Sequence, residues 1–172
     1  RLAAQPLRPL LERCIMLVQH QADLQEVEVE LDSPPYLPNV VCDASQIQQV
    51  VLVLAMNAIE AMPNGGTLRI RAHFPPDQAE AVIVVEDNGC GIEPDKLAHV
   101  FEPFYTTKEH GKGVGLGLAV AYGIVRRHHG RIEVESEPGL GTIFSVHLPL
   151  KQPEGERDEA ELPENITPPA EI

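Results

Sequence analysis

The sequence predicts an α+β fold in which helices cover one face of a sheet, and the hydrophobic patterning supports this prediction. Apolar and polar residues alternate in four segments, as in strands with one wet side: residues 27–31, 67–74, 131–137 and 142–148. A fifth segment, residues 81–86, is almost wholly apolar, which indicates a central strand. Helical spacing of apolar residues marks three more segments: 7 to about 21, 44–62 and about 115–129.

The first half of the chain has clear start and stop signals. The strand pattern of residues 27–31 ends before Pro34-Pro35, because proline cannot donate to a strand ladder. Residues 39–42 are predicted to add a short second strand. Asp43 then stands where an N-cap belongs, and Gln46 three residues later completes a start similar to a capping box, for a helix running to about Met62.

Turn residues separate the strands of the second half. Three proline- and glycine-containing segments, 63–66, 75–77 and 138–141, are predicted turns between strands. The apolar strand 81–86 delivers Asp87 at its end. Between residues 94 and 113 the pattern is irregular, which predicts an ordered loop that can move.

The composition bounds the class of protein. A chain of 172 residues with 43% hydrophobic content suffices for one globular core. It has no apolar run of about 18 residues and no signal peptide at its start, which predicts a soluble chain. Three widely separated cysteines argue against a disulfide framework and favour a cytosolic setting. A net charge of −13 disfavours nucleic acid as a partner.

The segment Asp87-Asn88-Gly89-Cys90-Gly91 is the strongest local signal for a binding site. A buried strand that ends in a carboxylate and a glycine turn builds a polar corner where a flat ligand can approach the backbone. Upstream, Asn57 lies within the apolar helix 44–62, where an amide needs partners. Taken alone, the position of Asn57 favours a structural asparagine that binds a neighbouring loop, and a ligand role is the alternative.

A second glycine run, residues 111–117, opens the helix predicted from about residue 115. It is not a Walker loop, because Lys112 is followed by Gly113 rather than by Ser or Thr, and it is not a dinucleotide fingerprint, because Leu118 stands where a third glycine is needed. Its backbone amides and the positive end of a helix favour an anion such as phosphate. Just upstream, Thr106, Thr107 and Lys108 could bind the same anion.

Together, these motifs resemble the ATP-binding catalytic domain of two-component sensor histidine kinases. That domain belongs to the GHKL superfamily, which includes gyrase, Hsp90 and MutL. Residues 49–62 resemble the N box, 87–91 the G1 box, 101–104 the F box, 113–117 the G2 box and 139–142 the final glycine motif. The sequence of residues 57–63, Asn-Ala-Ile-Glu-Ala-Met-Pro, is similar to the corresponding motif of the nitrogen-regulator subgroup. The resemblance implies a Bergerat fold, a two-layer α/β sandwich with a mixed, mostly antiparallel sheet.

The resemblance also implies roles for individual residues. Asp87 would accept a hydrogen bond from the adenine amino group, and Thr142 would support Asp87. Asn57 would offer its amide oxygen to Mg²⁺. Residues 94–113 would form the ATP lid, with Lys108 near the terminal phosphates. The full nucleotide-binding set implied is Asn57, Glu60, Ala61, Asp87, Gly89, Gly91, Ile92, Phe104, Thr106, Thr107, Lys108, Gly113, Val114, Gly115, Leu116, Gly117, Leu118 and Thr142.

Two departures from the family pattern shape the functional hypothesis. Val53 stands four residues before Asn57, where the ATPases of the superfamily have a glutamate and histidine kinases usually have a polar residue. Neither His20 nor the pair His128-His129 is followed by an acid, as the phosphoacceptor histidine would be. The two adjacent histidines are instead predicted to face solvent or to partner a helix end.

These observations imply a catalytic domain that presents the γ-phosphoryl group of ATP to a histidine on a separate domain. Residues 1–24 would link to the missing dimerisation and phosphoacceptor domain, 25–150 would bind ATP, and 151–172 would be a disordered acidic tail. The implied partners are ATP or ADP, the parent's helical domain and a response regulator receiver domain. A monomeric fragment of a homodimeric parent is expected, in the cytoplasm, with membrane anchoring of the parent left open. Two alternatives are a noncatalytic ATP/ADP sensor that regulates a phosphatase or another partner, and a purely structural interaction module.

Overall fold

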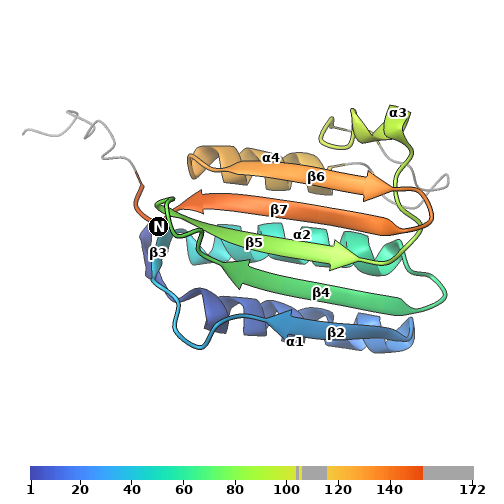
Figure 1. Ribbon diagram of the computed structural model, residues 1–172, viewed down its shortest axis with the longest axis horizontal. Coiled ribbons are helices and arrows are strands. Elements are labelled where there is room, and N and C mark those ends of the chain that lie inside the picture. The colour runs from blue at the N-terminus through green and yellow to red at the C-terminus, as the bar shows by residue number, and fades with distance from the viewer. Residues whose placement is uncertain (104, 106–115, 153–172) are drawn as a thin grey trace, which may run out of the picture.

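The computed structural model describes residues 1–103, 105 and 116–152, and these residues form two small layers of secondary structure (Figure 1). Eleven helices and strands follow one another within this described part: β1 (Ala3–Gln5), α1 (Leu7–Leu24), β2 (Val27–Asp32), β3 (Val40–Cys42), α2 (Ala44–Glu60), β4 (Gly66–His73), β5 (Glu80–Asp87), α3 (Pro94–Leu97), α4 (Gly117–Arg127), β6 (Arg131–Glu137) and β7 (Gly141–Pro149). None of the helices in these residues is both long enough and apolar enough to cross a membrane.

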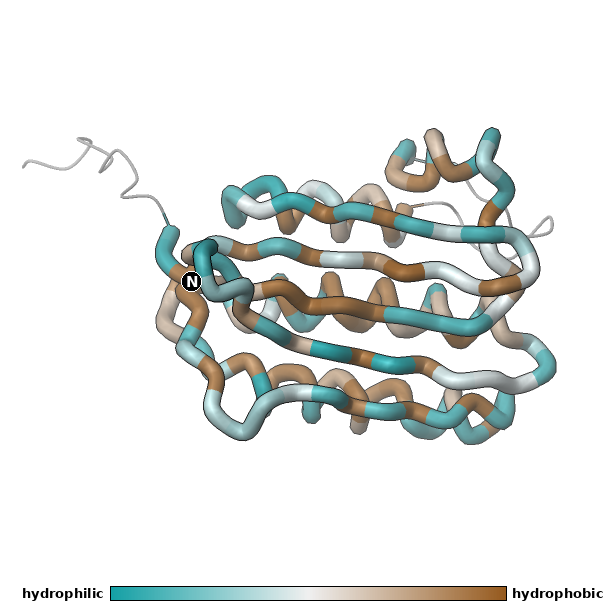
Figure 2. The backbone as a smooth tube through the Cα atoms, viewed as in Figure 1, coloured by the Kyte–Doolittle hydropathy of each residue, from teal (hydrophilic) through white to brown (hydrophobic). Residues whose placement is uncertain are grey.

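The main sheet has five strands in the order β2-β4-β5-β7-β6. β2 pairs with β4 in parallel, while the other three pairings are antiparallel. The predicted mixed, mostly antiparallel sheet is therefore confirmed. β5 lies at the centre, between β4 and β7, and Figure 2 shows it as the most continuously apolar strand of the sheet.

The three long helices α1, α2 and α4 lie together on one face of the sheet (Figure 1). Their inward residues and the alternate residues of the strands form one hydrophobic core, in which Leu10, Leu54 and Ile83 are fully buried. α1 packs on α2 and on β2, so this helix shares the core of the rest of the domain. The predicted division of the chain at residue 24 stays a prediction about the parent protein.

The N-cap predicted from the sequence for the helix α2 is present in the structure. Asp43 is the N-cap of α2, and its Oδ1 atom accepts a hydrogen bond from the Gln46 amide at 3.2 Å. This contact satisfies one of the four amides that the first turn of a helix leaves without a backbone partner. Two short elements were not predicted: β1, which pairs antiparallel with β3, and the one-turn helix α3.

The two adjacent histidines divide between the two predicted environments: His128 is a partner of the end of α4, and His129 faces solvent. The side chain of His128 is buried, with Nδ1 2.9 Å from the Ile124 carbonyl oxygen, and its Nε2 accepts from the Asp43 amide at 3.1 Å. Because Nε2 accepts, Nδ1 carries the ring proton and donates it. The ring thus joins the end of α4 to the start of α2, while His129 is exposed.

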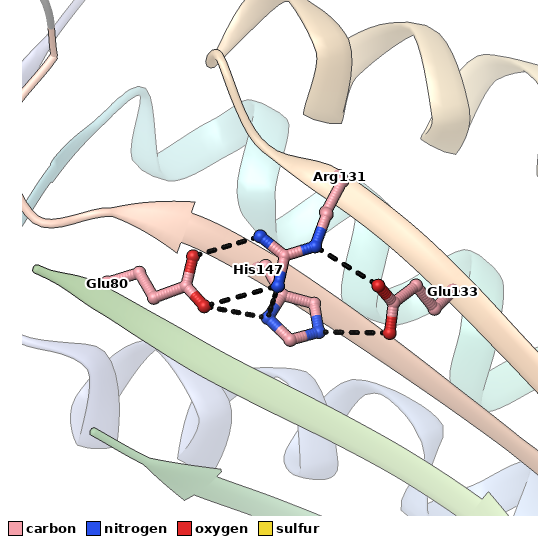
Figure 3. Close-up of polar contacts among 4 residues, drawn as sticks. All are labelled: Glu80, Arg131, Glu133 and His147. Atoms are coloured by element: carbon pink, nitrogen blue, oxygen red, sulfur yellow. Dashed lines mark hydrogen bonds and ion pairs between the residues drawn. The ribbon is translucent and has the colours of Figure 1, made fainter. Parts of the chain in front are cut away.

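The face of the sheet that points away from the helices is polar. Figure 3 shows four side chains that meet there, from β5, β6 and β7. Arg131 contacts Glu80 and Glu133, both at 3.1 Å, and His147 Nδ1 lies 3.1 Å from Glu80 Oε1. We call Glu80, Arg131, Glu133 and His147 the outer-face cluster.

Candidate nucleotide site

The candidate site lies at one end of the sheet, where several elements terminate together. β5 ends at Asp87, β6 ends at Glu137 and β7 begins at Gly141. The C-terminal end of α2 and the first turn of α4 lie at the same end of the molecule (Figure 1). The sequence segments that the motif analysis singled out are thereby brought together, as far as the structure describes them.

Asp87 is the central side chain of this corner. It is only 6% exposed, and it lies on the helix-covered side of β5, in register with Thr142 of β7. Its Oδ1 atom accepts from the Gly89 amide at 2.9 Å. Burial raises the pKa of Asp87 above its ordinary value of 3.8, helped by the nearby Glu86, although amide hydrogen bonds from Gly89 and Thr142 act in the opposite direction.

The loop after Asp87 is fastened to three neighbouring segments. Asn88 Oδ1 accepts from the Thr67 amide at 2.9 Å. The Cys90 amide donates to the Ala61 carbonyl at 3.1 Å, and the Cys90 carbonyl accepts from the Gly139 amide at 2.8 Å. These bonds fix the loop between the end of α2 and the β6–β7 turn, so its backbone is held in one arrangement.

Two glycines of this loop are required by close backbone approach. A Cβ at Gly89 would lie 2.4 Å from the Ala61 carbonyl oxygen. Gly91 has a φ of +73°, and a Cβ there would lie 2.2 Å from the Glu137 carbonyl oxygen. The G1-like glycines are therefore explained by geometry, since no larger residue fits either position without moving backbone.

α2 brings Asn57 to the same end of the molecule. Asn57 is half-buried, and no residue of the described part of the chain makes a hydrogen bond to its side-chain amide. One turn earlier on the same helical face is Val53. Glu60 is exposed and Ala61 half-buried, and the Ala61 carbonyl is already bound to the loop amide of Cys90.

α4 begins at Gly117, close to its predicted start. A Cβ at Gly117 would lie 3.3 Å from Cγ1 of Val53, so α4 approaches α2 closely at this point. The N-cap residue Leu116 offers no side-chain hydrogen bond to the first turn. The N-cap side chain therefore occupies none of the amide groups of that turn. Leu118 is half-buried against the core.

Part of the predicted site lies outside the described residues. This holds for seven of the residues expected to contact the nucleotide: Phe104, Thr106, Thr107, Lys108, Gly113, Val114 and Gly115. Their roles stay predictions. Within the described part, the structure groups Asp87, Gly89, Gly91, Ile92 and Thr142 around one corner.

Ser136 is a site residue that the sequence analysis missed. Its hydroxyl lies 2.8 Å from the Ile92 amide and 2.8 Å from Thr142 Oγ1. The signal was available, because Ser136 follows Ile132 and Val134 at the period of two residues that marks the buried face of a strand. A hydroxyl on the buried face of a strand, next to a glycine turn, needs a hydrogen-bond partner and so indicates a polar site nearby.

A two-layer domain with a mixed sheet, one helical layer and a polar corner at the strand ends defines the structural class. The comparison with protein families gives its identity: residues 42–152 match the model of the histidine kinase-, DNA gyrase B-, and HSP90-like ATPases. This match covers more than half of the chain, and the protein belongs to that family. The resemblance to the histidine kinase ATP-binding domain and the GHKL superfamily is confirmed, while the likeness to the nitrogen-regulator subgroup stays a prediction.

Curated relatives are sensor and sporulation kinases. The chain is 43% identical over 143 residues to sporulation kinase E of Bacillus subtilis, covering 83% of this chain and 19% of that protein. It is 42% identical over 149 residues to sensor kinase CckA of Brucella abortus (79% and 16%). It is 36% identical over 158 residues to sensor histidine kinase ZraS of Escherichia coli (90% and 33%). The chain thus spans between 16% and 33% of the length of these relatives.

Solved structures confirm the fold. The catalytic domain of histidine kinase ThkA superposes with a TM-score of 0.77 at 25% identity, covering 87% of this chain and 98% of that domain. Full-length ShkA, solved in complex with AMPPNP, gives a TM-score of 0.79 at 28% identity, covering 88% of this chain and 32% of ShkA. The predicted fold class is that of a histidine kinase ATPase domain.

Proposed function

We propose that the chain is the ATP-binding catalytic domain of a sensor histidine kinase and that it presents the γ-phosphoryl group of ATP to a histidine on another domain. The buried carboxyl of Asp87, positioned by backbone amides at a glycine-lined corner, is the single observation that carries this proposal. A fixed acceptor in such a corner suits the amino group of adenine, because guanine offers an oxygen at the same place. The nucleotide held by ShkA supports the same ligand class.

The residues present also fit a Mg²⁺ ion beside the phosphates. Mg²⁺ prefers hard oxygen ligands, and the Asn57 amide has no hydrogen-bond partner among the described residues. Asn57 would hold the ion through its amide oxygen, and Lys108 would contact the phosphates. Bound there, Mg²⁺ would neutralise charge on the transferring phosphoryl group. The first turn of α4, from Leu116 to Leu118, would face the phosphates with its amides.

Val53 limits what this domain does by itself. Valine cannot take a proton from water, and the close approach of Val53 to Gly117 places an apolar contact between α2 and α4. Phosphoryl transfer to a histidine requires positioning and charge neutralisation rather than a base on the nucleotide-binding domain. The geometry therefore favours transfer to a histidine over hydrolysis of ATP.

The remaining parts of the proposal concern the parent protein. The phosphoacceptor histidine would lie on a helical domain preceding this one, through which the parent would form a homodimer in the cytoplasm. The phosphoryl group would pass on to a response regulator. ThkA has been solved in complex with the response regulator protein TrrA, which supports a partner of this kind.

Nucleotide binding is tested by thermal unfolding of the 172-residue chain with ADP, with and without Mg²⁺. Ligand at a hundred times its dissociation constant stabilises the folded state by about 2.7 kcal/mol, so the melting temperature rises. In the Asn57→Ala variant, Mg²⁺ should no longer strengthen ADP binding, whereas Asn64→Ala, in the exposed turn before β4, should behave as wild type. If ADP with Mg²⁺ leaves the melting temperature unchanged, the structural-module alternative is favoured.

Kinase activity is tested with the parent protein and ATP labelled in the γ-phosphoryl group. The expected product is an acid-labile, alkali-stable phosphohistidine on the parent, abolished by Asp87→Asn. Mg·ATP binding without any phosphohistidine would instead establish the noncatalytic sensor. The observation that supports this second function is Val53, which stands where histidine kinases usually have a polar residue.

A further inference from the structure

Ser136 occupies the junction between the loop after β5 and the turn before β7. Its Oγ atom accepts from the Ile92 amide at 2.8 Å, donates to the Gly141 carbonyl at 2.9 Å and lies 2.8 Å from Thr142 Oγ1. One hydroxyl thus links two segments that the proposed function places around the nucleotide base. The β6–β7 pairing sets Ser136 directly opposite Thr142.

The three contacts determine which hydroxyl donates to which. A carbonyl oxygen only accepts, so the contact with Gly141 uses the single hydrogen of Ser136. The Ile92 amide uses one lone pair of the same oxygen. The remaining contact then requires Thr142 to donate its hydroxyl hydrogen to Ser136. Thr142 Oγ1 is left with lone pairs only, and it acts as an acceptor toward anything else in the site.

The direction of this hydrogen bond, from Thr142 to Ser136, matters because Thr142 lies in the candidate site. Thr142 is 4% exposed and is the cross-strand partner of Asp87, on the same helix-facing side of the sheet. The corner therefore holds two neighbouring acceptors, the Asp87 carboxyl and the Thr142 hydroxyl. An amino group can donate to such a pair, whereas a ring carbonyl in the same place meets only lone pairs.

We propose that Ser136 is a specificity-determining positioning residue, which holds the Thr142 hydroxyl as an acceptor and thereby selects a base carrying an amino group over one carrying a carbonyl. The inference rests on the proposed adenine nucleotide function and deepens it. Ser136 acts through Thr142 and does not itself touch the base. Without Ser136, the Thr142 hydroxyl is free to rotate and donate, so the site accepts a carbonyl more readily.

The test compares the dissociation constants of ADP and inosine diphosphate, which carries a carbonyl in place of the adenine amino group. Calorimetric titration of the 172-residue chain gives both constants for each variant. Wild type should prefer ADP, and Ser136→Ala should reduce the ADP preference by roughly tenfold, the size of one net hydrogen bond. Ser136→Thr, which keeps the hydroxyl, should restore the preference.

A double-mutant cycle separates this role from simple fastening of the loop. With Thr142→Val as background, Ser136→Ala should leave the ADP preference unchanged, because no hydroxyl remains to be oriented. Ser145→Ala is the matched control, since Ser145 lies on the opposite face of β7 and the same change there should alter neither constant.

The outcomes separate this inference from the function on which it rests. Wild type that binds ADP, with a Ser136→Ala variant that loses affinity for both nucleotides equally, overturns the role of Ser136 alone. A fall in preference that persists in the Thr142→Val background overturns it too, because Thr142 would not carry the effect. Wild type that binds no ADP overturns the proposed function, and this inference with it.

Discussion

At the residue scale, Asp87 shows a conflict between stability and function. Its burial favours the protonated form, yet the proposed adenine contact needs an acceptor. Because the folded-state pKa is raised, Asp87 binds its proton more tightly in the folded chain, and the stability of the empty domain falls as pH rises through that pKa. Above that pH, the buried charge is a cost that bound nucleotide would offset.

Asp87→Asn is therefore expected to uncouple the two properties. Asparagine keeps an oxygen for the Gly89 amide and removes the buried charge, so the empty variant should melt no lower than wild type. Its NH₂ group would face the adenine amino group donor to donor, and ADP affinity should fall by about a hundredfold or more. Calorimetry and thermal unfolding measure the two effects.

The neighbouring residue provides the control for this variant. Glu86 lies on the opposite face of β5, 3.1 Å from Arg71, so Glu86→Gln makes the same chemical change away from the site. It should keep wild-type ADP affinity. Unchanged ADP affinity in Asp87→Asn would contradict the assignment of the adenine contact.

The sequence could identify Asp87 and Thr142 because each belongs to a motif with glycines at fixed spacing. It could not identify Ser136 as part of the site, because its role depends on cross-strand pairing with Thr142 and on a contact with Ile92, 44 positions away in the chain. Asn57 was recognised as a ligand candidate only through the resemblance. Its place on α2 is now known, while the residues expected to surround the phosphates lie outside the described part.

At the element scale, the turn between β6 and β7 contains two glycines that differ in the space available for a side chain. Gly139 has a φ of +79°, and a Cβ there would have no neighbour within 4 Å. Gly141 has a φ of +131°, and a Cβ there would lie 2.0 Å from the Asp87 carbonyl oxygen. The turn tolerates a side chain at the first position much better than at the second.

Alanine at each of these positions tests that difference. Gly139→Ala should lower the free energy of unfolding by about 1 kcal/mol, the cost of a left-handed residue. Gly141→Ala adds a backbone clash beneath Asp87 and should cost roughly 3 kcal/mol or more, with loss of ADP binding. Urea unfolding of both variants measures the costs, and equal costs would contradict the close approach at Gly141.

Elements that rest on local patterns were predicted well, whereas those that depend on distant partners were not. The helix and strand segments of the main sheet follow hydrophobic periodicity and turn residues, and the structure places them within a few residues of the expected bounds. β1 has only three residues and exists through its pairing with β3. His128 is buried because the Asp43 amide, far away in the chain, needs an acceptor.

At the scale of the whole molecule, the sheet is covered by helices on one side and by its own long polar side chains on the other. Val82 and Val84 point to this outer face, yet they are only 3% and 6% exposed. Their cross-strand partners on this face include polar residues with long side chains: Arg71 pairs with Val84, and His147 of the outer-face cluster pairs with Val82. The outer face is therefore polar at its surface and apolar beneath.

The outer-face cluster should contribute to stability in a pH-dependent way. Burial opposes ionisation of Glu80, but hydrogen bonds from His147 and Arg131 outweigh it and lower the pKa of Glu80. A lowered folded-state pKa gives stability that is present above the ordinary value and is lost as pH falls through the folded-state value.

Glu80→Gln should thus destabilise the domain near pH 7, by about 1 kcal/mol or less because the group is partly hydrated. The difference from wild type should disappear in the acid range, below the lowered pKa. Unfolding by urea at a series of pH values measures it, with Glu135→Gln, an exposed acid on β6, as control. A difference that stays constant down to the acid limb would contradict the role assigned to the ion pairs.

The order of strands also determines which side chains lie along the two edges of the sheet. Among the residues that the structure describes, β2 and β6 are the edge strands. Both alternate apolar residues with glutamates: Glu28 and Glu30 on one, Glu133, Glu135 and Glu137 on the other. Unpaired strand edges invite a second molecule to add to the sheet, and charged side chains on an edge strand oppose such addition. We therefore expect the same alternation that identified these strands in the sequence to disfavour edge-to-edge polymerisation of the folded domain.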